Sequence, residues 1–335
     1  MDRPSAHAIL SRYRDALYRR AEDPDAVRTA LDGTFDPGAV IHLCHPLGDA
    51  EGGAGLLEAA LAPLARAMPD LERTDAIAVA GPVRDEWWVG HFGHYRGTFE
   101  RSFLDIPPTG RAAHMRYHEF FRVSDRRVVE MQAIWDIPAL MMQAKAWPMG
   151  PSLGVEWLAP APATGDGLAP AGGDAESSLQ HVLDMLAGLQ RHAEEGAEAM
   201  GLQRFWHPKM LWYGPAGIGT NRGIAGFRRD HQIPFLNAMP DRYGAGETKV
   251  FFAEGDYVGT TGWPNMGMTV SGGGWLGIAP PNRQIEMRSL DFWRLEDGLL
   301  RENWVLVDLL HAWDQLDVDV LARMREMTFN RQKAD

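Results

Sequence analysis

Residues 283–308 read RQIEMRSLDFWRLEDGLLRENWVLVD, and residues 111–136 read RAAHMRYHEFFRVSDRRVVEMQAIWD. A constant offset aligns the two stretches. The matching groups are Met115-Arg116 with Met287-Arg288, Phe120-Phe121-Arg122 with Phe292-Trp293-Arg294, Glu130 with Glu302, and Asp136 with Asp308. We interpret this correspondence as an internal duplication, so two copies of one fold are the first hypothesis for the chain.

Each stretch has the pattern of a β-hairpin. Apolar and aromatic residues occupy both faces of two predicted strands, and a short polar turn separates the strands. In the later copy the turn is Glu296-Asp297-Gly298. A three-residue loop with Gly298 in the left-handed conformation would place Asp291 opposite Asn303.

Composition limits the partners of the protein. The 335 residues are enough for two domains of ordinary size. Lys and Arg total 33 against 45 Asp and Glu, and this formal charge of −12 argues against binding to nucleic acid or to a membrane surface. The single cysteine, Cys44, excludes an intramolecular disulfide. The N-terminal segment lacks the apolar core of a signal peptide, so we expect a soluble cytoplasmic protein.

A change in composition marks the domain boundary. Proline, glycine and alanine dominate residues 148–176, and no amphipathic period continues through them. We therefore predict a first domain at residues 1–147, a linker at 148–176 and a second domain at 177–335. In both domains helical patterns come first and strand patterns follow, which predicts an α+β fold with helices on a curled antiparallel sheet.

Strand alternation places Asp291 on one face of its hairpin, among apolar and polar neighbours. These neighbours are Met287, Ser289, Trp293, Asn303, Val305 and Val307. A carboxylate in such surroundings is desolvated, which raises its pKa toward the range of a general acid or base at neutral pH. The alternative is a structural Asp291 that accepts a hydrogen bond from Arg283, Arg288 or a tyrosine, and the sequence leaves both open.

Other motifs predict no bound group. The glycine-rich residues 214–223 lack the spacing of a phosphate-binding loop. His42 and His45, like His91 and His94, are three residues apart, and such positions on a strand face opposite ways, which is unsuitable for one metal ion. We expect no metal site and no cofactor.

Several segments resemble the SnoaL-like polyketide cyclases. In the first half these are GHYRGTF at residues 93–99, IPPTGR at 106–111 and the hairpin after them. The second half is similar through Gly262-Trp263, GIAPP at 277–281 and the Glu302-Asn303-Trp304 strand. The resemblance covers nearly everything except the linker. It implies a nuclear transport factor 2-like fold in each half, a cone of helices against a curled sheet, in a tandem two-domain member.

The resemblance also implies a mechanism. Well-studied members close an aldol ring without a cofactor, using an aspartate directly after a Glu-His-Trp triplet and a histidine on the partner strand. The aspartate position holds Val305 in the second half and Ala133 in the first. The histidine position holds Asp291 and Glu119, so a carboxylate on the partner strand becomes the candidate proton-transfer group.

We therefore expect a cofactor-independent enzyme that performs acid/base chemistry on a hydrophobic, cyclic or polyketide-like metabolite. The reaction would be a cyclisation, an isomerisation, a hydration or a dehydration. The alternative is a non-catalytic protein that binds a small molecule in the same apolar pocket. The candidate catalytic residues are Asp291, Asn303 and His231, and the candidate substrate-binding residues are Trp212, Tyr213, Gln232, Trp263, Trp275, Ser289, Trp293 and Val305. A first-domain pocket would contain His42, His45, His94, Tyr117 and Glu119, but we expect the better pocket in the second half.

Members of this fold commonly dimerise through the outer faces of their sheets. Here the linker holds two copies in one chain at high effective concentration, so we expect the halves to form an intramolecular pseudo-dimer. The predicted seam includes Leu290, Phe292, Trp304 and Leu306. Further oligomerisation is left open.

Overall fold

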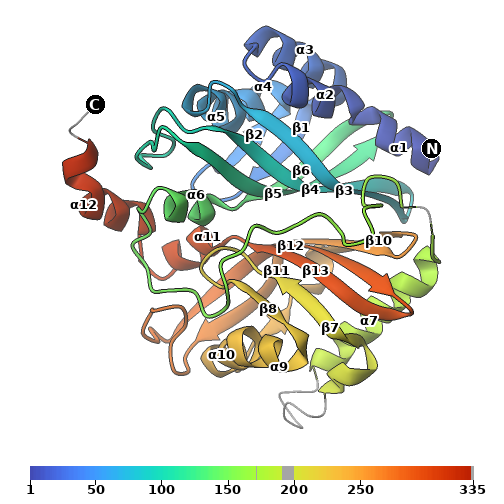
Figure 1. Ribbon diagram of the computed structural model, residues 1–335. Coiled ribbons are helices and arrows are strands. Elements are labelled where there is room, and N and C mark those ends of the chain that lie inside the picture. The colour runs from blue at the N-terminus through green and yellow to red at the C-terminus, as the bar shows by residue number, and fades with distance from the viewer. Residues whose placement is uncertain (171, 191–199, 333–335) are drawn as a thin grey trace. The chain divides into compact units, whose positions relative to one another are not determined.

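The computed structural model describes residues 1–170, 172–190 and 200–332 of the chain. The chain divides into two compact units. Unit 1 contains residues 1–148 and the segment that begins at Asp308, and unit 2 contains residues 149–307. In each unit helices pack on one face of a mainly antiparallel sheet (Figure 1). The duplicated α+β layout predicted from the repeated hairpin is confirmed.

Unit 1 opens with helices and continues into a six-stranded sheet of order β2-β1-β6-β5-β4-β3, in which β1 and β6 are parallel. Its helices up to residue 143 are α1 (Arg3–Ile9), α2 (Ser11–Arg19), α3 (Pro24–Thr34), α4 (Gly52–Leu56), the π-helical η1 (Leu57–Leu61), α5 (Ala62–Ala67) and α6 (Ile137–Gln143). Its strands are β1 (Phe35–Leu43), β2 (Asp49–Glu51), β3 (Glu72–Val83), β4 (Glu86–Thr98), β5 (Ala112–Ser124) and β6 (Arg127–Trp135).

Unit 2 repeats this order of elements. Its sheet has the order β10-β11-β12-β13-β7-β8, with β9 paired to β11 and with β7 parallel to β13. The helices are α7 (Ala175–Gln190), the 3₁₀ turns η3 (Leu202–Arg204) and η5 (Gly246–Thr248), α9 (Gly223–Phe227), the π-helical η4 (Arg228–Gln232) and α10 (Ile233–Ala238). The strands are β7 (Trp206–Tyr213), β8 (Thr220–Arg222), β9 (Tyr243–Gly244), β10 (Lys249–Glu254), β11 (Tyr257–Val270), β12 (Arg283–Glu296) and β13 (Leu299–Val307).

A widened helical turn occurs at the same place in both units. The π-helical turns η1 and η4 come directly before α5 and α10, and each of these helices has a proline in its first turn, Pro63 and Pro234. Because proline has no N–H and its ring clashes with the preceding turn, the helix accommodates it by widening. In unit 2 this turn carries His231 and Gln232, two candidate site residues.

The two long hairpins have the same register. Arg122 pairs with Glu130 in unit 1 and Arg294 pairs with Glu302 in unit 2, and each arginine binds its glutamate, at 2.9 Å and 2.7 Å respectively. Both hairpins also shift register at the next residue, which marks a β-bulge. An alignment made from residue types alone therefore describes a true structural repeat.

The predicted pairing of Asp291 with Asn303 is wrong. The loop has two residues, because Glu296 pairs with Leu299, and the bulge then adds one residue to β13. As a result Asp291 pairs with Val305, and Asn303 pairs with Trp293. Asp291, Asn303 and Val305 still share one face of the sheet, since the displacement along β13 is two residues.

The segment after β13 belongs to unit 1, which differs from the predicted second domain of residues 177–335. It contains α11 (Leu309–Asp314) and α12 (Val320–Gln332). Asp308 accepts a hydrogen bond from the His45 N–H at 3.0 Å, and the Trp313 ring lies 5.6 Å from that of Trp147. Burial of Trp313 explains why the segment packs there, because a large aromatic surface leaves water.

The predicted linker is packed rather than loose along part of its length. Trp304 donates from Nε1 to the Pro160 carbonyl at 2.9 Å, and the Ala163 N–H donates to Glu302 at 3.2 Å. Val155 forms an isolated β-bridge with Thr220. The proline and glycine content that indicated a linker thus belongs to an irregular segment that covers one face of the unit 2 sheet.

The four residues of the predicted seam are fully buried: Leu290, Phe292, Trp304 and Leu306. The connecting segment supplies part of this cover through Pro160. Pairing of the two halves stays a prediction.

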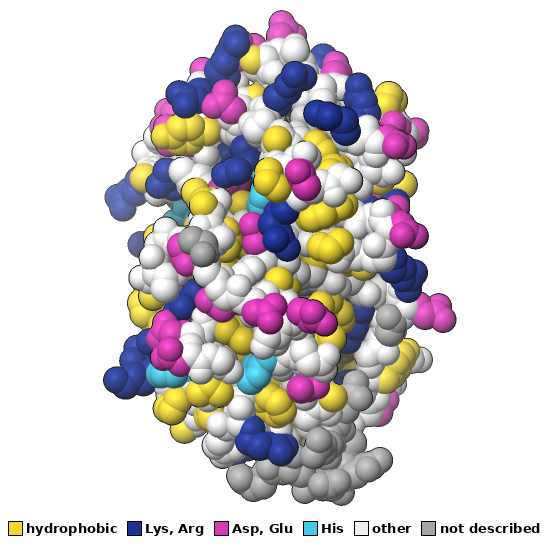
Figure 2. Space-filling view, turned by 90° about the vertical axis from the view of Figure 1, so that its right-hand side faces the viewer, with side chains coloured by type: hydrophobic (Ala, Val, Ile, Leu, Met, Phe, Trp, Pro, Cys, Tyr) yellow, Lys and Arg dark blue, Asp and Glu magenta, His cyan; other side chains and the backbone are white. Residues whose placement is uncertain are grey.

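The surface has a mixed charge pattern. On the face shown in Figure 2, acidic and basic side chains are interspersed among hydrophobic and polar ones. Within the described part of the chain, no helix has the length and apolar character needed to cross a bilayer.

Candidate active site

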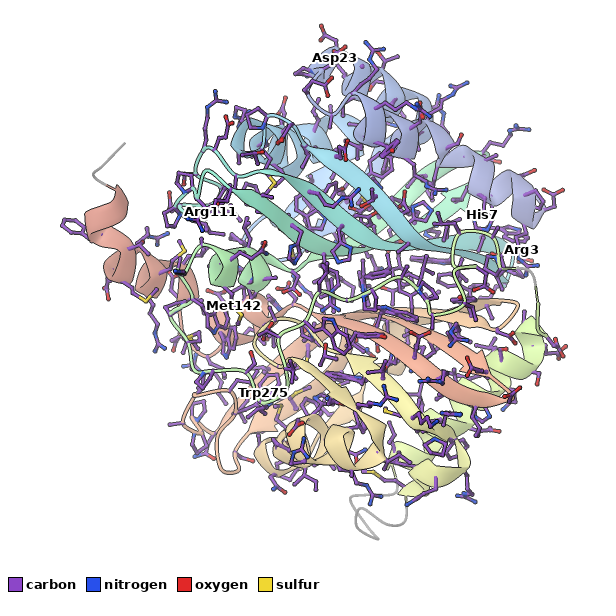
Figure 3. All side chains as sticks on the ribbon, viewed as in Figure 1. Arg3, His7, Asp23, Arg111, Met142 and Trp275 are labelled. Atoms are coloured by element: carbon purple, nitrogen blue, oxygen red, sulfur yellow. The ribbon has the colours of Figure 1, made fainter. Side chains whose placement is uncertain are left out.

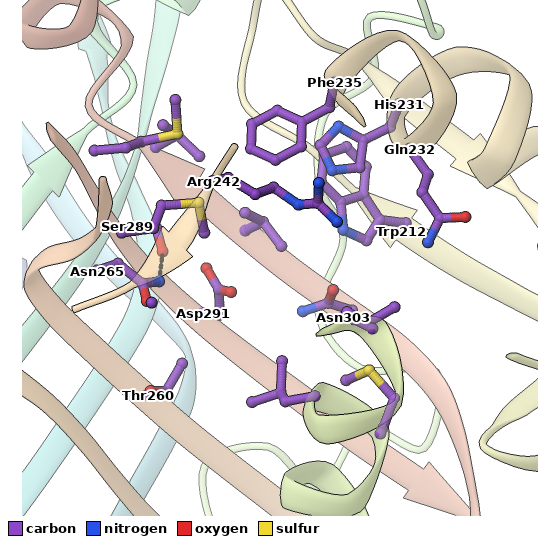
Figure 4. A pocket seen from close by; sticks show the side chains of 18 of the residues that line it. Trp212, His231, Gln232, Phe235, Arg242, Thr260, Asn265, Ser289, Asp291 and Asn303 are labelled. Atoms are coloured by element: carbon purple, nitrogen blue, oxygen red, sulfur yellow. Dashed lines mark hydrogen bonds between the residues drawn. The ribbon is translucent and has the colours of Figure 1, made fainter. Parts of the chain in front are cut away.

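Unit 2 contains a cavity of about 510 Å³ between its sheet and helices α7, α9 and α10. This volume is in the range of small-molecule pockets. Figure 4 shows side chains that reach it from both layers, with Asp291 and Asn303 on the sheet and His231 and Phe235 on the helical side.

A row of paired side chains crosses four strands on the cavity side of the sheet. The row consists of Phe251, Thr260, Asp291 and Val305, on β10, β11, β12 and β13. The alternation predicted for the hairpin also holds for the other cavity-lining residues on β12 and β13. These are Met287, Ser289, Trp293, Asn303 and Val307.

Aromatic rings from β7 and from the helices form another wall of the cavity. The Trp212 ring stacks on the His231 imidazole with centroids 4.1 Å apart and an interplanar angle of 17°. Phe227 and Phe235 lie 5.3 Å and 5.7 Å from the same imidazole. Trp206 stacks on Phe227. Flat rings at these distances make a wall that suits a planar, apolar ligand.

Asp291 carries an unusual carboxyl group. Its side chain is part-buried and faces the cavity, and its Oδ1 atom is buried with no hydrogen-bond partner among the described residues. Burial raises the pKa of Asp291 to about 8, although nearby Lys249 acts in the opposite direction. The ion pair or hydrogen bond to Arg283, Arg288 or a tyrosine, which was the structural alternative, is not found in the described part of the chain. A carboxyl group of this kind can exchange a proton near neutral pH.

His231 is held in its neutral form. Burial lowers the pKa of the imidazole to about 3, and its Nδ1 atom has no partner among the described residues. Because the ring is uncharged at neutral pH, it can donate or accept a hydrogen bond but is not a ready source of a proton.

Amide and hydroxyl groups add hydrogen-bonding capacity. Asn303 is buried and donates from Nδ2 to the Phe292 carbonyl at 2.9 Å, which fixes its side chain. Asn265 donates to the Ser289 hydroxyl, a contact drawn in Figure 4. Asn265 reaches this place because Gly262 has no side chain: a Cβ there would lie 2.6 Å from the Asn265 Cα.

The family model for SnoaL-like polyketide cyclases matches residues 8–144 and 185–316, which together are most of the chain. The chain belongs to the SnoaL-like polyketide cyclase family. No curated protein matches it.

Several solved structures are similar to part of this chain. A candidate SnoaL-like polyketide cyclase from Jannaschia sp. CCS1 is 23% identical, with a TM-score of 0.36, over 42% of this chain and 95% of its own. IdmH from Streptomyces antibioticus, described as a candidate polyketide cyclase, is 25% identical, with a TM-score of 0.35. The match covers 43% of this chain and 99% of IdmH. A candidate polyketide cyclase from Acidithiobacillus ferrooxidans is 18% identical, with a TM-score of 0.34. The match covers 42% of this chain and 94% of the other.

Three predicted pocket residues of the second SnoaL-like half lie outside the cavity lining. Tyr213 is on the other face of the sheet, and its hydroxyl donates to Glu302 at 3.1 Å. Trp263 lies at the register shift of β11 under the Arg288 guanidinium, which is 4.5 Å from the ring centre. Trp275, labelled in Figure 3, comes from the loop after β11 and supports Phe235 from 5.8 Å away.

In the first SnoaL-like half a closed polar network surrounds Glu119. Both carboxylate oxygens are fully buried and accept hydrogen bonds from four side chains. The donors are Tyr13 at 3.0 Å, Arg73 at 2.5 Å, Tyr95 at 2.8 Å and the Trp135 indole at 3.1 Å. A carboxylate with this many donors is held in a fixed position.

The network continues through Asp75. Its carboxylate binds Arg73 at 2.9 Å and Arg14 at 2.9 Å and accepts a hydrogen bond from Tyr117 at 2.8 Å. Burial alone would raise the pKa of Asp75, but the adjacent guanidinium of Arg73 holds it well below its usual value. Tyr117 and Glu119 thus both belong to one buried ionic cluster.

The predicted histidines of the first half do not join this cluster. His42 is near the sheet edge and contacts Asp49 at 3.0 Å, while His45 contacts Asp308 through its backbone. His94 faces the other side of β4, where burial lowers its pKa to about 3. His91, rather than His94, lies beside the cluster, with its Nδ1 atom 3.3 Å from the Arg73 guanidinium. In the described residues, no three His, Cys, Asp or Glu side chains are arranged to hold a metal ion.

Several cavity residues were not predicted. They are Trp206, Phe227, Phe235, Arg242, Tyr243, Lys249, Phe251, Thr260 and Asn265. Pairing of β10 with β11 and of β11 with β12 would have pointed to Phe251 and Thr260, because cross-strand neighbours share a face. Arg242 comes from an irregular loop, where side-chain direction has no sequence period.

Proposed function

We propose that unit 2 is a cofactor-independent acid/base catalyst that acts on a hydrophobic, carbonyl-containing cyclic or polyketide-like metabolite. Asp291 is the proton-transfer group. The observation that carries this proposal is a carboxyl oxygen that is buried without a partner, beside a cavity of about 510 Å³, in a group whose pKa is about 8. Catalytic efficiency in proton transfer is greatest when the pKa is near the working pH.

The cavity also offers groups that can stabilise an oxygen anion as it develops. The Trp293 indole Nε1 is buried without a partner in the described residues, and the neutral His231 has a free ring position. A fixed donor costs little reorganisation when charge develops on a carbonyl oxygen during enolisation. Asp291 removes or returns the proton at the adjacent carbon, and the aromatic wall holds the ring of the substrate.

Simple binding is the second candidate. It is favoured by Val305, which stands where catalytic relatives have an aspartate and lies directly opposite Asp291. Without that second acid, turnover depends on Asp291 alone, whereas binding needs only the apolar cavity and its hydrogen-bonding groups.

Proton exchange on a model ketone tests the catalytic proposal. We expect the protein to accelerate exchange of the C1 protons of 2-tetralone in D₂O, measured by proton NMR, with a rate that rises with pH and levels off above about pH 8. Asp291→Asn should lower this rate by about 100-fold or more, since an amide cannot accept the proton.

The matched control is Asp297→Asn, in the exposed turn of the same hairpin. It should leave the exchange rate unchanged. If Asp291→Asn exchanges the ketone as fast as the original protein while both bind it, Asp291 is not the catalytic group and the binding function remains.

A further inference from the structure

Two cations line the cavity together with Asp291. Arg242 comes from the loop before β9, and Lys249 begins β10. Figure 4 shows the side chains of Arg242 and Asp291 among those that line the cavity. Neither side chain has a hydrogen bond or ion pair with any residue that the structure describes, although most charged groups in a partly buried setting are paired.

Both cations are in an unfavourable environment. Burial lowers the pKa of Arg242, and burial likewise lowers the pKa of Lys249, for which the charge of Asp291 only partly compensates. Asp291 is itself mostly protonated at neutral pH, because its pKa is about 8. The cavity therefore has an excess of positive charge without a matching anion among its described residues.

The cavity also has a large aromatic part. The aromatic wall consists of Trp206 and Trp212 from β7 together with Phe227 and Phe235 from the helices. A ligand that satisfies both parts has a flat apolar ring and an anionic oxygen group. A guanidinium offers parallel N–H donors that match the two oxygens of a carboxylate.

We infer that the substrate of the unit 2 site is a ring-containing apolar carboxylic acid, whose carboxylate binds Arg242 and Lys249 while its ring packs on the aromatic wall. This inference deepens the proposed function by naming a substrate class for the same cavity.

A pair of probes of the same shape tests this inference on the full chain. 2-Naphthoate carries a carboxylate at pH 7, and 2-naphthamide is its neutral isostere. Isothermal titration should give a dissociation constant at least about 10-fold lower for the carboxylate. Arg242→Gln and Lys249→Gln should each reduce this preference, and the double variant should abolish it while binding of the amide changes little.

Arg229→Gln is the matched control. Arg229 is exposed and bound to Asp230 outside the cavity, so the preference for 2-naphthoate should persist. Equal affinity for the two probes, a preference that survives in the double variant, or absence of saturable 2-naphthoate binding would each overturn the inference. Circular dichroism of every variant checks that it is folded.

The outcome is separable from that of the proposed function. Loss of the carboxylate preference with an intact Asp291-dependent exchange of 2-tetralone rejects only the substrate class. Selective carboxylate binding with exchange that is independent of Asp291 rejects only the catalytic role.

Discussion

Asp291 and Glu119 occupy equivalent places in the two hairpins, yet their surroundings are opposite. Glu119 receives four hydrogen bonds and the charge of Arg73. Asp291 faces a cavity with one buried oxygen unpartnered in the described residues. The position along the strand therefore determines on which face of the sheet each carboxyl side chain lies. The residues that other elements place around it determine its hydrogen bonds.

The raised pKa of Asp291 makes its ionisation a cost to folding. In the unfolded protein the Asp291 carboxyl group has an ordinary pKa of about 4, and in the folded protein its pKa is about 8. Between these pH values the folded state therefore binds more protons than the unfolded state. The contribution of the protonated Asp291 carboxyl group to the free energy of unfolding is thus complete below about pH 4, and it is lost as the pH rises through 8. Asp291→Asn should raise the melting temperature more at pH 8.5 than at pH 5. The corresponding difference in the free energy of unfolding is on the order of a few kcal/mol.

Thermal melts of both proteins at the two pH values measure this difference. Asp297→Asn should show no such pH-dependent gain. A variant that is less stable than the original protein at pH 8.5 would mean that Asp291 has a structural partner after all.

Glu119 should show the opposite behaviour. Glu119→Gln replaces the carboxylate that contacts Arg73, which leaves the buried guanidinium without one of its partners. We expect a loss of about 3–5 kcal/mol in urea unfolding of unit 1. Glu100→Gln, at an exposed position of the same unit, should change stability by less than about 0.5 kcal/mol. Equal unfolding midpoints for the two variants would contradict a stabilising network.

Each hairpin depends on a tight turn with unusual backbone angles. Asp297 and Gly298 both have positive φ, of 53° and 74°. Gly298→Ala adds a Cβ that meets no atom within 4 Å, so its cost is purely conformational. We expect a loss of about 1 kcal/mol in urea unfolding.

Gly273→Ala is the control for the turn. It also has no neighbour within 4 Å, and its φ lies outside the left-handed region. Its unfolding midpoint should not fall. If both alanine variants lose the same stability, the positive φ of Gly298 is not the cause.

Element types could be predicted from the sequence, and element pairing could not. Alternation placed Ser289, Trp293 and Val305 beside the cavity, because side-chain direction on a strand has a fixed period. The register failed at the turn, where a bulge adds a residue without a composition signal. Trp263 was misplaced for the same reason, since it lies at a second register shift.

Site residues outside the hairpin were harder to predict. His231 and Gln232 were identified, but Arg242 and Lys249 were not, because their contribution depends on how β9 and β10 join the sheet edge. The histidines of the first half were assigned to a pocket from their residue type. Pairing across β4 and β5 instead brought His91 next to Glu119.

The division of the chain into units does not follow chain order. The segment that begins at Asp308 is part of unit 1, although it follows the last strand of unit 2. Trp313→Ala should therefore destabilise unit 1, by about 3–5 kcal/mol for a buried tryptophan, and spare the cavity of unit 2. Hydrogen exchange followed by mass spectrometry should show faster exchange in peptides of residues 1–148.

Phe329→Ala is the control for this segment, since Phe329 is exposed. It should leave exchange in unit 1 unchanged. Faster exchange confined to residues 149–307 in Trp313→Ala would show that the segment supports unit 2 instead.

The closed network around Glu119 has an evolutionary consequence. In a dimer of identical subunits, every substitution occurs at both sites, so a residue that fills one pocket fills the other. Tandem duplication removes that constraint, because Arg73 can fill the space beside Glu119 while the Asp291 cavity keeps its own neighbours. Mutational tolerance should therefore differ between the two halves: around Glu119 it is limited by the buried hydrogen bonds that a substitution breaks, and around Asp291 by the shape and polarity of the cavity.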